Sequence, residues 1–244
     1  MRGAVLGKVI ASKAPSLPVG SYVTCISGWT ELAIVNAKDA TLLEVPPNGK
    51  PTDAMGVLGM TGMTAYFGII DIGQVKAGDF VVVSGAAGAT GSVVCQIAKL
   101  KGAKVLGIAG SDDKVQWLKE LGCDDALNYK DSEFAKNFKA ATKDLIDVFF
   151  DNVGGDVLEL ALSRAKPHSR FVMCGGKHCV VVSYQFSITD NAQLSASTTP
   201  PHPWVQRSAQ SPILPAPKAD ILLELLNDHR DENQAARLHR FRLR

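Results

Sequence analysis

Short apolar runs rich in β-branched residues alternate with longer amphipathic segments between residues 54 and 176. The apolar runs are 80–84, 104–108, 126–128, 146–150 and 170–173. Nearly continuous apolar runs are typical of strands in a parallel sheet that is covered on both faces. The segments between them, which are predicted helices, are 92–101, 112–121, 131–141 and 157–165. With right-handed crossovers, this alternation predicts an α/β fold with a doubly wound, Rossmann-type parallel sheet.

The predicted helix 112–121 has the clearest boundaries. Ser111 stands at the N-cap position, and Gly122 follows the last turn, where a left-handed residue commonly ends a helix. Val115, Leu118 and Leu121 recur at three-residue spacing, which indicates one buried stripe.

The first 53 residues have a different pattern. Apolar runs at 5–10 and 22–26 stand between turn signals, 32–35 continues the pattern, and Pro46-Pro47-Asn48-Gly49 ends it. Three or four short strands are few for a free-standing β domain. We therefore expect residues 1–53 to be an incomplete β domain and residues 54–176 to be the Rossmann-type domain.

Residues 177–244 fit neither pattern. Half of the 12 prolines fall between residues 200 and 217, among Ser, Thr, Gln and Asn. Such a segment buries too little apolar surface to offset its chain entropy, so we predict an irregular, disordered tail. Within it, 221–226 could form a short helix, and the basic end at 237–244 is interpreted as a solvated tail rather than a binding arm.

Composition excludes several classes of protein. Hydrophobic residues make up 46% and the net charge is +2, which argues against a nucleic-acid-binding or polybasic membrane-surface protein. No stretch approaches the ~20 apolar residues of a membrane helix, and Lys8 interrupts the only candidate secretory signal. The five cysteines are scattered and odd in number, which favours a reducing, cytoplasmic compartment. No Cys-x-x-Cys pair occurs, so no metal site is predicted.

The main chemical signal is a glycine-rich turn. The predicted strand 80–84 runs into Gly85-Ala86-Ala87-Gly88-Ala89-Thr90-Gly91, and a predicted helix follows. Backbone N–H groups at a helix N-terminus bind phosphate, and a glycine lets the pyrophosphate approach closely. Because the turn lies inside a βαβ unit, it predicts dinucleotide binding rather than only a tight turn.

The end of the next predicted strand favours NADP over NAD. An NAD site places an acid at this strand tip, whereas here Gly110-Ser111 leaves space and the acids Asp112 and Asp113 follow in the first helical turn. Lys114 supplies a cation for an additional phosphate. The alternative is that Lys114 is an ordinary surface lysine.

A set of motifs resembles one family. Residues 59–68 and 75–79, the loop Ala87–Gly91, and Asp151-Asn152-Val153-Gly154-Gly155 resemble the zinc-free branch of the medium-chain dehydrogenase/reductase superfamily, especially prostaglandin reductases and 2-alkenal reductases. The resemblance spans roughly residues 3–176. It starts partway through the family's GroES-like β domain and ends after Gly176, where the family continues with a segment that this chain lacks.

The resemblance implies NADPH-dependent reduction of the C=C bond of an α,β-unsaturated aldehyde or ketone, with hydride delivered to the β-carbon. It also implies a cytoplasmic enzyme with a small-molecule enone or enal substrate, no metal, no nucleic-acid or membrane partner, and dimers among intact relatives. No catalytic residue is assigned. The implied cofactor-binding residues are Gly88, Ala89, Thr90, Gly91, Lys114, Tyr129, Asn152, Cys174, Gly175 and Thr64.

Other interpretations remain open. Tyr129 could be a surface ring, Asn152 a helix cap, Thr64 a helical residue that bonds its own backbone, and Cys174 a core residue. At the level of function, the alternatives are an NADPH:quinone reductase, or a non-catalytic NADP-binding fragment or pseudoenzyme. A further alternative is that residues 177–244 are translated from an intron or from a shifted reading frame. In that case the chain would have no function of its own.

Overall fold

The computed structural model describes residues 3–175 and the strands Gln185–Ile188 and Leu194–Ser197. The described chain divides after Gly59 into two compact units, of which the second begins at Met60. Each unit is described by itself.

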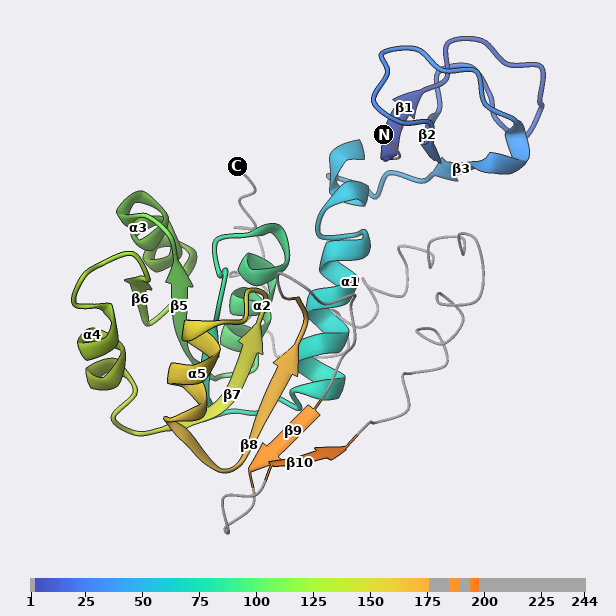
Figure 1. The fold of residues 1–244 in the computed structure, drawn as a ribbon. Coiled ribbons are helices and arrows are strands. Elements are labelled where there is room, and N and C mark those ends of the chain that lie inside the picture. Colours follow the sequence, from blue (N-terminus) through green and yellow to red (C-terminus); the bar gives the residue numbers. More distant parts are fainter. Residues whose placement is uncertain (1–2, 176–184, 189–193, 198–244) are drawn as a thin grey trace. The chain divides into compact units, whose positions relative to one another are not determined.

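The unit that begins at Met60 is built on a sheet with the strand order β10-β9-β8-β7-β4-β5-β6 (Figure 1). Its strands are β4 (Phe80–Val83), β5 (Lys104–Ala109), β6 (Asp125–Asn128), β7 (Ile146–Asp151), β8 (Ala165–Met173), β9 (Gln185–Ile188) and β10 (Leu194–Ser197). The five strands β4 to β8 are parallel, and β9 and β10 extend the sheet in antiparallel fashion. The chain moves outward from β4 to β6 and then returns to β7, so the direction of winding reverses between β4 and β7.

Helices cover both faces of this sheet, with α4 and α5 on one face and α1 and α2 on the other (Figure 1). The helices are α1 (Met60–Phe67), which continues into the π-helical turn η3 (Gly68–Ile72), α2 (Ala89–Leu100), α3 (Asp112–Leu121), α4 (Phe134–Ala141) and α5 (Asp156–Leu162). A Cβ at Gly68 would lie 2.6 Å from Cε2 of Phe150, so glycine lets this helix approach β7 closely. The doubly wound α/β fold is therefore confirmed.

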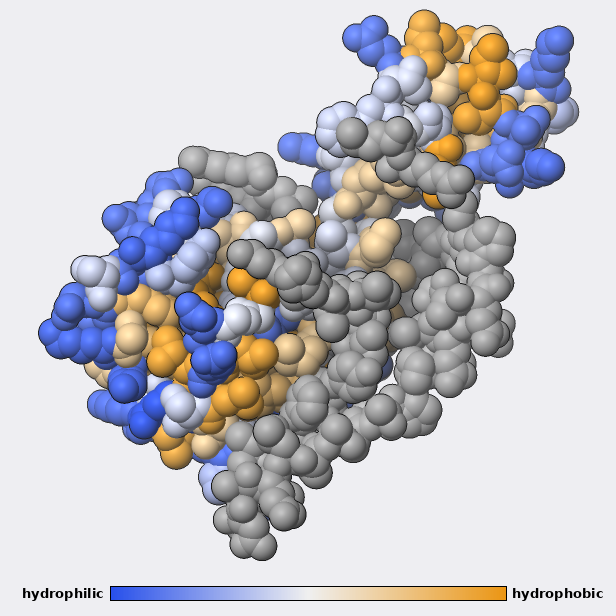
Figure 2. Space-filling model, viewed as in Figure 1, coloured by the Kyte–Doolittle hydropathy of each residue, from blue (hydrophilic) through white to orange (hydrophobic). Residues whose placement is uncertain are grey.

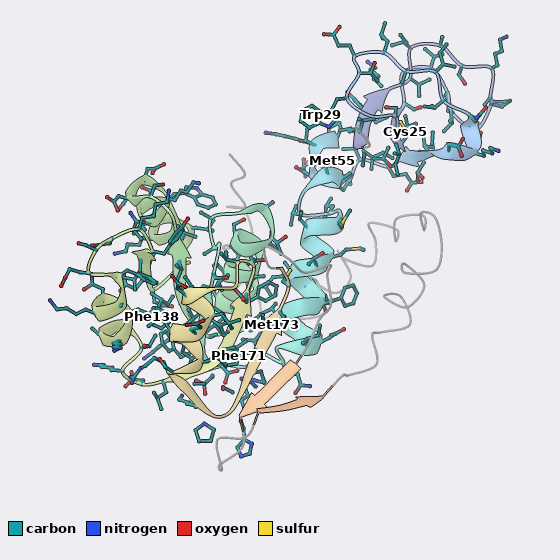
Figure 3. All side chains as sticks on the ribbon, in the orientation of Figure 1. Cys25, Trp29, Met55, Phe138, Phe171 and Met173 are labelled. Atoms are coloured by element: carbon teal, nitrogen blue, oxygen red, sulfur yellow. The ribbon has the colours of Figure 1, made fainter. Side chains whose placement is uncertain are left out.

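One cluster of the core of this unit lies between the sheet and helices α4 and α5. Phe138 of α4 and Phe171 of β8 point into it, and both are fully buried (Figure 3). Phe149 packs against Phe171 with ring centroids 5.4 Å apart. Such aromatic pairs contribute more than their buried area alone.

Most predicted elements occur where the pattern places them. Helix α3 spans the predicted residues, and Gly122 ends it with a φ of 110°. The hydroxyl of Ser111 does not cap this helix. Helix α2 begins at Ala89, three residues before its predicted start, because Gly88 serves as the N-cap.

The unit of residues 3–59 contains an antiparallel sheet in the order β1-β2-β3. Its elements are β1 (Ala4–Lys8), β2 (Tyr22–Ile26), β3 (Ala40–Leu43) and the short 3-10 helices η1 (Ala37–Asp39) and η2 (Pro51–Met55). The expectation of a strand at 32–35 is wrong, since this segment is irregular and β3 instead pairs with β2. Hydrophobic residues, in orange, reach the surface of this unit in Figure 2.

Most of residues 177–244, including the expected helix at 221–226 and the basic end at 237–244, lies outside the described residues. Strands β9 and β10 fall inside this segment, where the sequence pattern predicts no regular structure. Among the described residues, none of the helices has the length and apolar character needed to cross a membrane.

Candidate functional site

The glycine-rich turn joins the end of β4 to the N-terminus of α2. Gly85 has a φ of 57°, a left-handed conformation that favours glycine. Gly88 is the N-cap, and the first helical bond runs from the Ser92 N–H to the Gly88 carbonyl at 2.9 Å. The N–H groups of Ala89, Thr90 and Gly91 precede that bond, so they have no acceptor within the helix. They form the positive end of the helix dipole.

Gly91 is required by close packing. A Cβ at this position would overlap the Gly85 carbonyl and lie 2.8 Å from the Ala86 Cα. The space around Gly88 is also restricted, because a Cβ added at this position would lie 3.1 Å from the Gly85 carbonyl oxygen. The turn therefore folds back on itself, and glycine at positions 88 and 91 lets the start of α2 pack closely against Gly85 and Ala86.

The end of β7 is tied to the end of β4 by side chains. The Ser84 hydroxyl donates to Oδ1 of Asp151 at 2.6 Å, and it accepts from the Asn152 N–H at 2.8 Å. The Asn152 side-chain amide donates to the Ser84 carbonyl at 2.8 Å. Asn152 is thereby fixed at the point where the winding of the sheet reverses, the place where open α/β sheets bind ligands.

The end of β8 reaches the same place. The N–H groups of Cys174 and Gly175 donate to the Asp151 carbonyl at 2.8 and 3.0 Å. A Cβ at Gly175 would lie 3.1 Å from the Asn152 carbonyl. Burial, and after it the negative charge of Asp151, raises the pKa of the Cys174 thiol.

The ends of β5 and β6 form a second part of the site. The Tyr129 ring lies against Gly110, since a Cβ there would be 2.9 Å from Cε1 of the ring. The Tyr129 N–H donates to the Ala109 carbonyl at 3.0 Å. Asn128 donates to Asp112 at 2.8 Å, which joins the end of β6 to the first turn of α3. Any larger residue than glycine at position 110 would displace the tyrosine.

Lys114 is exposed in the first turn of α3. A hydrogen bond from Ser111, with smaller contributions that include the charge of Lys114, lowers the pKa of the exposed Asp113 carboxyl. The lysine therefore stands in a turn that also carries a negative charge, beside the strand end that holds Gly110.

Thr64 lies in α1, where its hydroxyl donates to the Met60 carbonyl at 2.7 Å. In the part of the chain that the structure describes, this hydroxyl thus bonds within its own helix rather than to the strand ends. The predicted residues thus gather in two groups, with Gly88, Ala89, Thr90, Gly91, Asn152, Cys174 and Gly175 around β4, β7 and β8, and Lys114 and Tyr129 around β5 and β6.

Comparison with known proteins identifies the family. The family model described as zinc-binding dehydrogenase matches residues 89–206. The chain is 46% identical over 178 residues to prostaglandin reductase 1 of Bos taurus, which covers 72% of this chain and 54% of the relative. The chain belongs to the medium-chain dehydrogenase/reductase superfamily. It spans about half the length of the curated relatives that it matches.

Two further members of the superfamily are similar. The NADPH-dependent curcumin reductase of Escherichia coli K12 is 38% identical over 176 residues, covering 72% of this chain and 51% of the relative. The crystal structure of CurA from Vibrio vulnificus in complex with NADPH superposes with a TM-score of 0.66 at 35% identity. That superposition covers 85% of this chain and 58% of CurA.

The family model that matches this chain has zinc binding in its description. Within the described residues, no group of three or more His, Cys, Asp and Glu side chains is arranged to hold a metal ion.

Sequence reasoning missed the part played by Ser84 and Asp151. The sequence patterns include Asp151 only as the first residue of the family motif at 151–155. They include Ser84 only as the last residue of the predicted strand 80–84. A signal was present, because a hydroxyl directly before a glycine turn and an acid at the end of another buried strand would meet at one edge of a parallel sheet.

Proposed function

We propose that the ends of β4 to β8 bind NADP(H), and that the protein reduces the C=C bond of an α,β-unsaturated aldehyde or ketone. The observation that carries the proposal is the turn at Gly88–Gly91, where small residues form the N-terminus of α2 and a Cβ at Gly91 has no room. The names of the curcumin reductase and of the CurA complex state NADPH for those proteins, which supports the same cofactor here.

The residues present fit a dinucleotide. A Cβ at Gly91 has no room, and the N–H groups of the first turn of α2, which have no acceptor within the helix, are donors for a diphosphate. At the adenosine end, Lys114 and the Tyr129 ring would hold the 2′-phosphate and the adjoining ribose. The small residues Gly110 and Ser111 leave space where an NAD-specific protein would carry an acid.

At the other end, Asn152, Cys174 and Gly175 would face the nicotinamide side, and Thr64 the carboxamide. When bound, the cofactor supplies a hydride. The chain's own residues bind and orient it, and buried strand ends exclude water around it. No residue is assigned as an acid or base, so the catalytic residue stays open.

The cofactor preference gives a direct test. NADPH and NADH binding is measured by calorimetry on the full chain and on Lys114→Glu, with the exposed Lys143→Glu as a matched charge reversal. We expect NADPH to bind more tightly than NADH, and Lys114→Glu alone to remove about tenfold of that preference, as for one lost charge-assisted contact. Equal selectivity in the two variants would remove Lys114 from the site.

Turnover separates the candidate activities. NADPH oxidation is followed with a simple enone and with a simple quinone at matched concentrations. Faster oxidation with the enone supports the alkenal or enone reductase, and faster oxidation with the quinone supports the quinone reductase. NADPH binding with neither oxidation identifies a non-catalytic NADP-binding protein.

We further propose a cytoplasmic location and, because the resemblance implies dimers among intact relatives, a homodimer. The four described cysteines, Cys25, Cys95, Cys123 and Cys174, are free thiols, which is typical of a reducing compartment. Light scattering on the purified chain measures the oligomeric state, and a monomer would contradict the dimer.

A further inference from the structure

Asp151 is a fully buried acid at the end of β7. Its Oδ1 accepts three hydrogen bonds, from the Ser84 hydroxyl at 2.6 Å and from the N–H groups of Val153 and Gly154 at 3.1 and 3.0 Å. Its Oδ2 is buried and has no hydrogen-bond partner among the described residues. Burying a carboxylate with hydrogen bonds to only one of its two oxygens costs free energy of folding. Asp151 must therefore contribute something at this strand end that offsets the cost.

The bonds of Asp151 bring three strand ends together. Through Ser84 it reaches the end of β4, and its backbone carbonyl receives the N–H groups of Cys174 and Gly175 from β8. The same Ser84 hydroxyl accepts the Asn152 N–H at 2.8 Å. The Ser84 hydroxyl thus bonds both the Asp151 carboxyl group and the Asn152 backbone N–H. These two bonds fix the direction in which the chain leaves β7 at Asn152.

We propose that Asp151 and Ser84 form a positioning pair, which holds Asn152 and the start of the glycine turn in the geometry that binds the cofactor. This inference rests on the proposed function for the role of Asn152 at the nicotinamide side. Neither Asp151 nor Ser84 contacts the cofactor in this arrangement. Both act through the backbone and side-chain amide of Asn152 and through the turn that begins at Gly85.

Cys174 offers a readout of the pair that needs no cofactor. Burial and the charge of Asp151 raise the pKa of this thiol. Replacing Asp151 with the isosteric asparagine removes the charge and keeps the burial, so the Cys174 pKa must fall. A lowered pKa shows that the variant is folded with position 151 beside Cys174 and that the charge has been removed, so a change in NADPH affinity is then not due to loss of the fold.

The experiment compares Asp151→Asn, Ser84→Ala and a matched control, Ser169→Ala. Ser169 is as buried as Ser84, and its hydroxyl makes no hydrogen bond among the described side chains. Iodoacetamide labelling of Cys174 is followed by peptide mass spectrometry between pH 7 and 10 without cofactor. The dissociation constant for NADPH is measured in parallel, and far-UV circular dichroism records folding.

We expect labelling of Cys174 to reach half its maximal rate at lower pH in Asp151→Asn than in the wild type. We expect Asp151→Asn and Ser84→Ala each to weaken NADPH binding about tenfold, and Ser169→Ala to stay within about twofold. If Asp151→Asn fails to fold, the NADPH affinity of Ser84→Ala relative to Ser169→Ala decides the proposal.

NADPH affinity that stays unchanged in folded Asp151→Asn and Ser84→Ala would overturn the positioning pair, whatever their melting temperatures and whatever the labelling of Cys174. Failure of the wild type to bind NADPH would instead overturn the proposed function. In that case the pair, which is defined by that site, falls with it, whereas a wild type that binds NADPH and variants that bind it equally well overturn the pair alone.

Discussion

The two units of the chain both contain hydrogen-bonded sheets, but only the unit that begins at Met60 encloses an extensive core. There Phe138, Phe149 and Phe171 are fully buried. In residues 3–59, Leu17 and Val23 are the buried hydrophobic residues of the described chain. Large hydrophobic side chains that are exposed in this unit are Ile10, Val19, Ile26, Trp29, Leu32, Ile34, Val35, Leu42 and Met55.

From this difference we expect the smaller unit to be the less stable, because strand pairing alone contributes little. Backbone hydrogen bonds in a sheet largely replace hydrogen bonds to water, whereas apolar burial contributes about 25 cal/mol per Å². Three short strands with little buried between them leave the smaller unit with few sources of stability. The proposed cofactor site accordingly lies on the unit whose core can hold its loops in place.

The largest expected effect comes from deleting a core aromatic ring. Phe149→Ala should destabilise the chain by about 3–5 kcal/mol, since it removes a fully buried ring and leaves a cavity beside Phe171. The matched change in the other unit, Ile34→Ala, should alter stability by less than about 0.5 kcal/mol, because that side chain is fully exposed. Urea denaturation followed by circular dichroism measures both.

Limited proteolysis sharpens this first comparison. Cleavage within residues 3–59 should precede cleavage within 60–175 in the wild type, because local opening is easiest where few apolar contacts hold the chain. Cleavage in the reverse order would show that the smaller unit is more stable than its burial indicates. An equal loss of stability in Phe149→Ala and Ile34→Ala would show the same.

A buried ion pair gives the second comparison. Arg170 Nη2 lies 2.6 Å from Oδ2 of Asp79, and the two side chains are 14% and 6% exposed. Arg170→Met should cost about 3 kcal/mol, because it leaves a buried carboxylate without its partner. In the smaller unit, the bond between Asn36 and Asp39 is exposed, so Asn36→Ala should cost less than about 0.5 kcal/mol.

Thermal unfolding of the same two variants is the measurement. The matching double change, Arg170→Met with Asp79→Leu, should recover part of the loss, since it removes the unpaired charge as well. No recovery would mean that Arg170 stabilises the chain by packing rather than by charge.

Local signals explain what could be predicted from the sequence. Helix α3 occupies the predicted residues because Gly122 and the stripe through Leu118 act within one helix. The segment 32–35 was predicted as a strand from its apolar residues, but Ile34 is fully exposed, and β3 pairs with β2 instead. Strand pairing depends on partners distant in sequence, which a local pattern does not contain.

The same distinction holds for the site. The turn at Gly88–Gly91 was predictable because its residues are consecutive and follow a strand. The bond between Ser84 and Asp151 joins residues 67 positions apart, so only the order of the strands reveals it. Lys114 was placed at the adenosine end from its position after the strand tip, and Tyr129 by resemblance; the structure puts the Tyr129 ring against Gly110.

Glycine substitutions compare the backbone of the two units. Gly91→Ala forces a Cβ against Gly85 and Ala86, so it should destabilise the chain by about 1–3 kcal/mol and abolish NADPH binding. Gly7→Ala in β1 meets nothing within 4 Å, so it should have little effect. Calorimetric melting with and without NADPH reports both properties, and a Gly91→Ala chain that is stabilised by NADPH as much as wild type would contradict the assigned turn.

The smallest expected effect concerns Asp124, the acid directly before β6. Burial alone would raise the pKa of Asp124, but hydrogen bonds from Lys99 Nζ and from the Val105 N–H lower it below the usual value. A carboxyl whose pKa is lower in the folded than in the unfolded state stabilises the fold above the unfolded pKa. That contribution is lost as the pH falls through the folded pKa.

Asp124→Asn should therefore cost about 0.5–1 kcal/mol at pH 7, a modest figure because solvent screens a pair whose side chains are 33% and 46% exposed. The loss should shrink as the pH falls below about 4, where the wild-type carboxylate takes up its proton. Urea midpoints at pH 7, 5 and 3 measure this, with the exposed Glu31→Gln of the smaller unit as the matched charge removal. An Asp124→Asn deficit that stayed constant down to pH 3 would mean that the side chain stabilises β5 through geometry alone, and that the larger unit gains nothing from this charge.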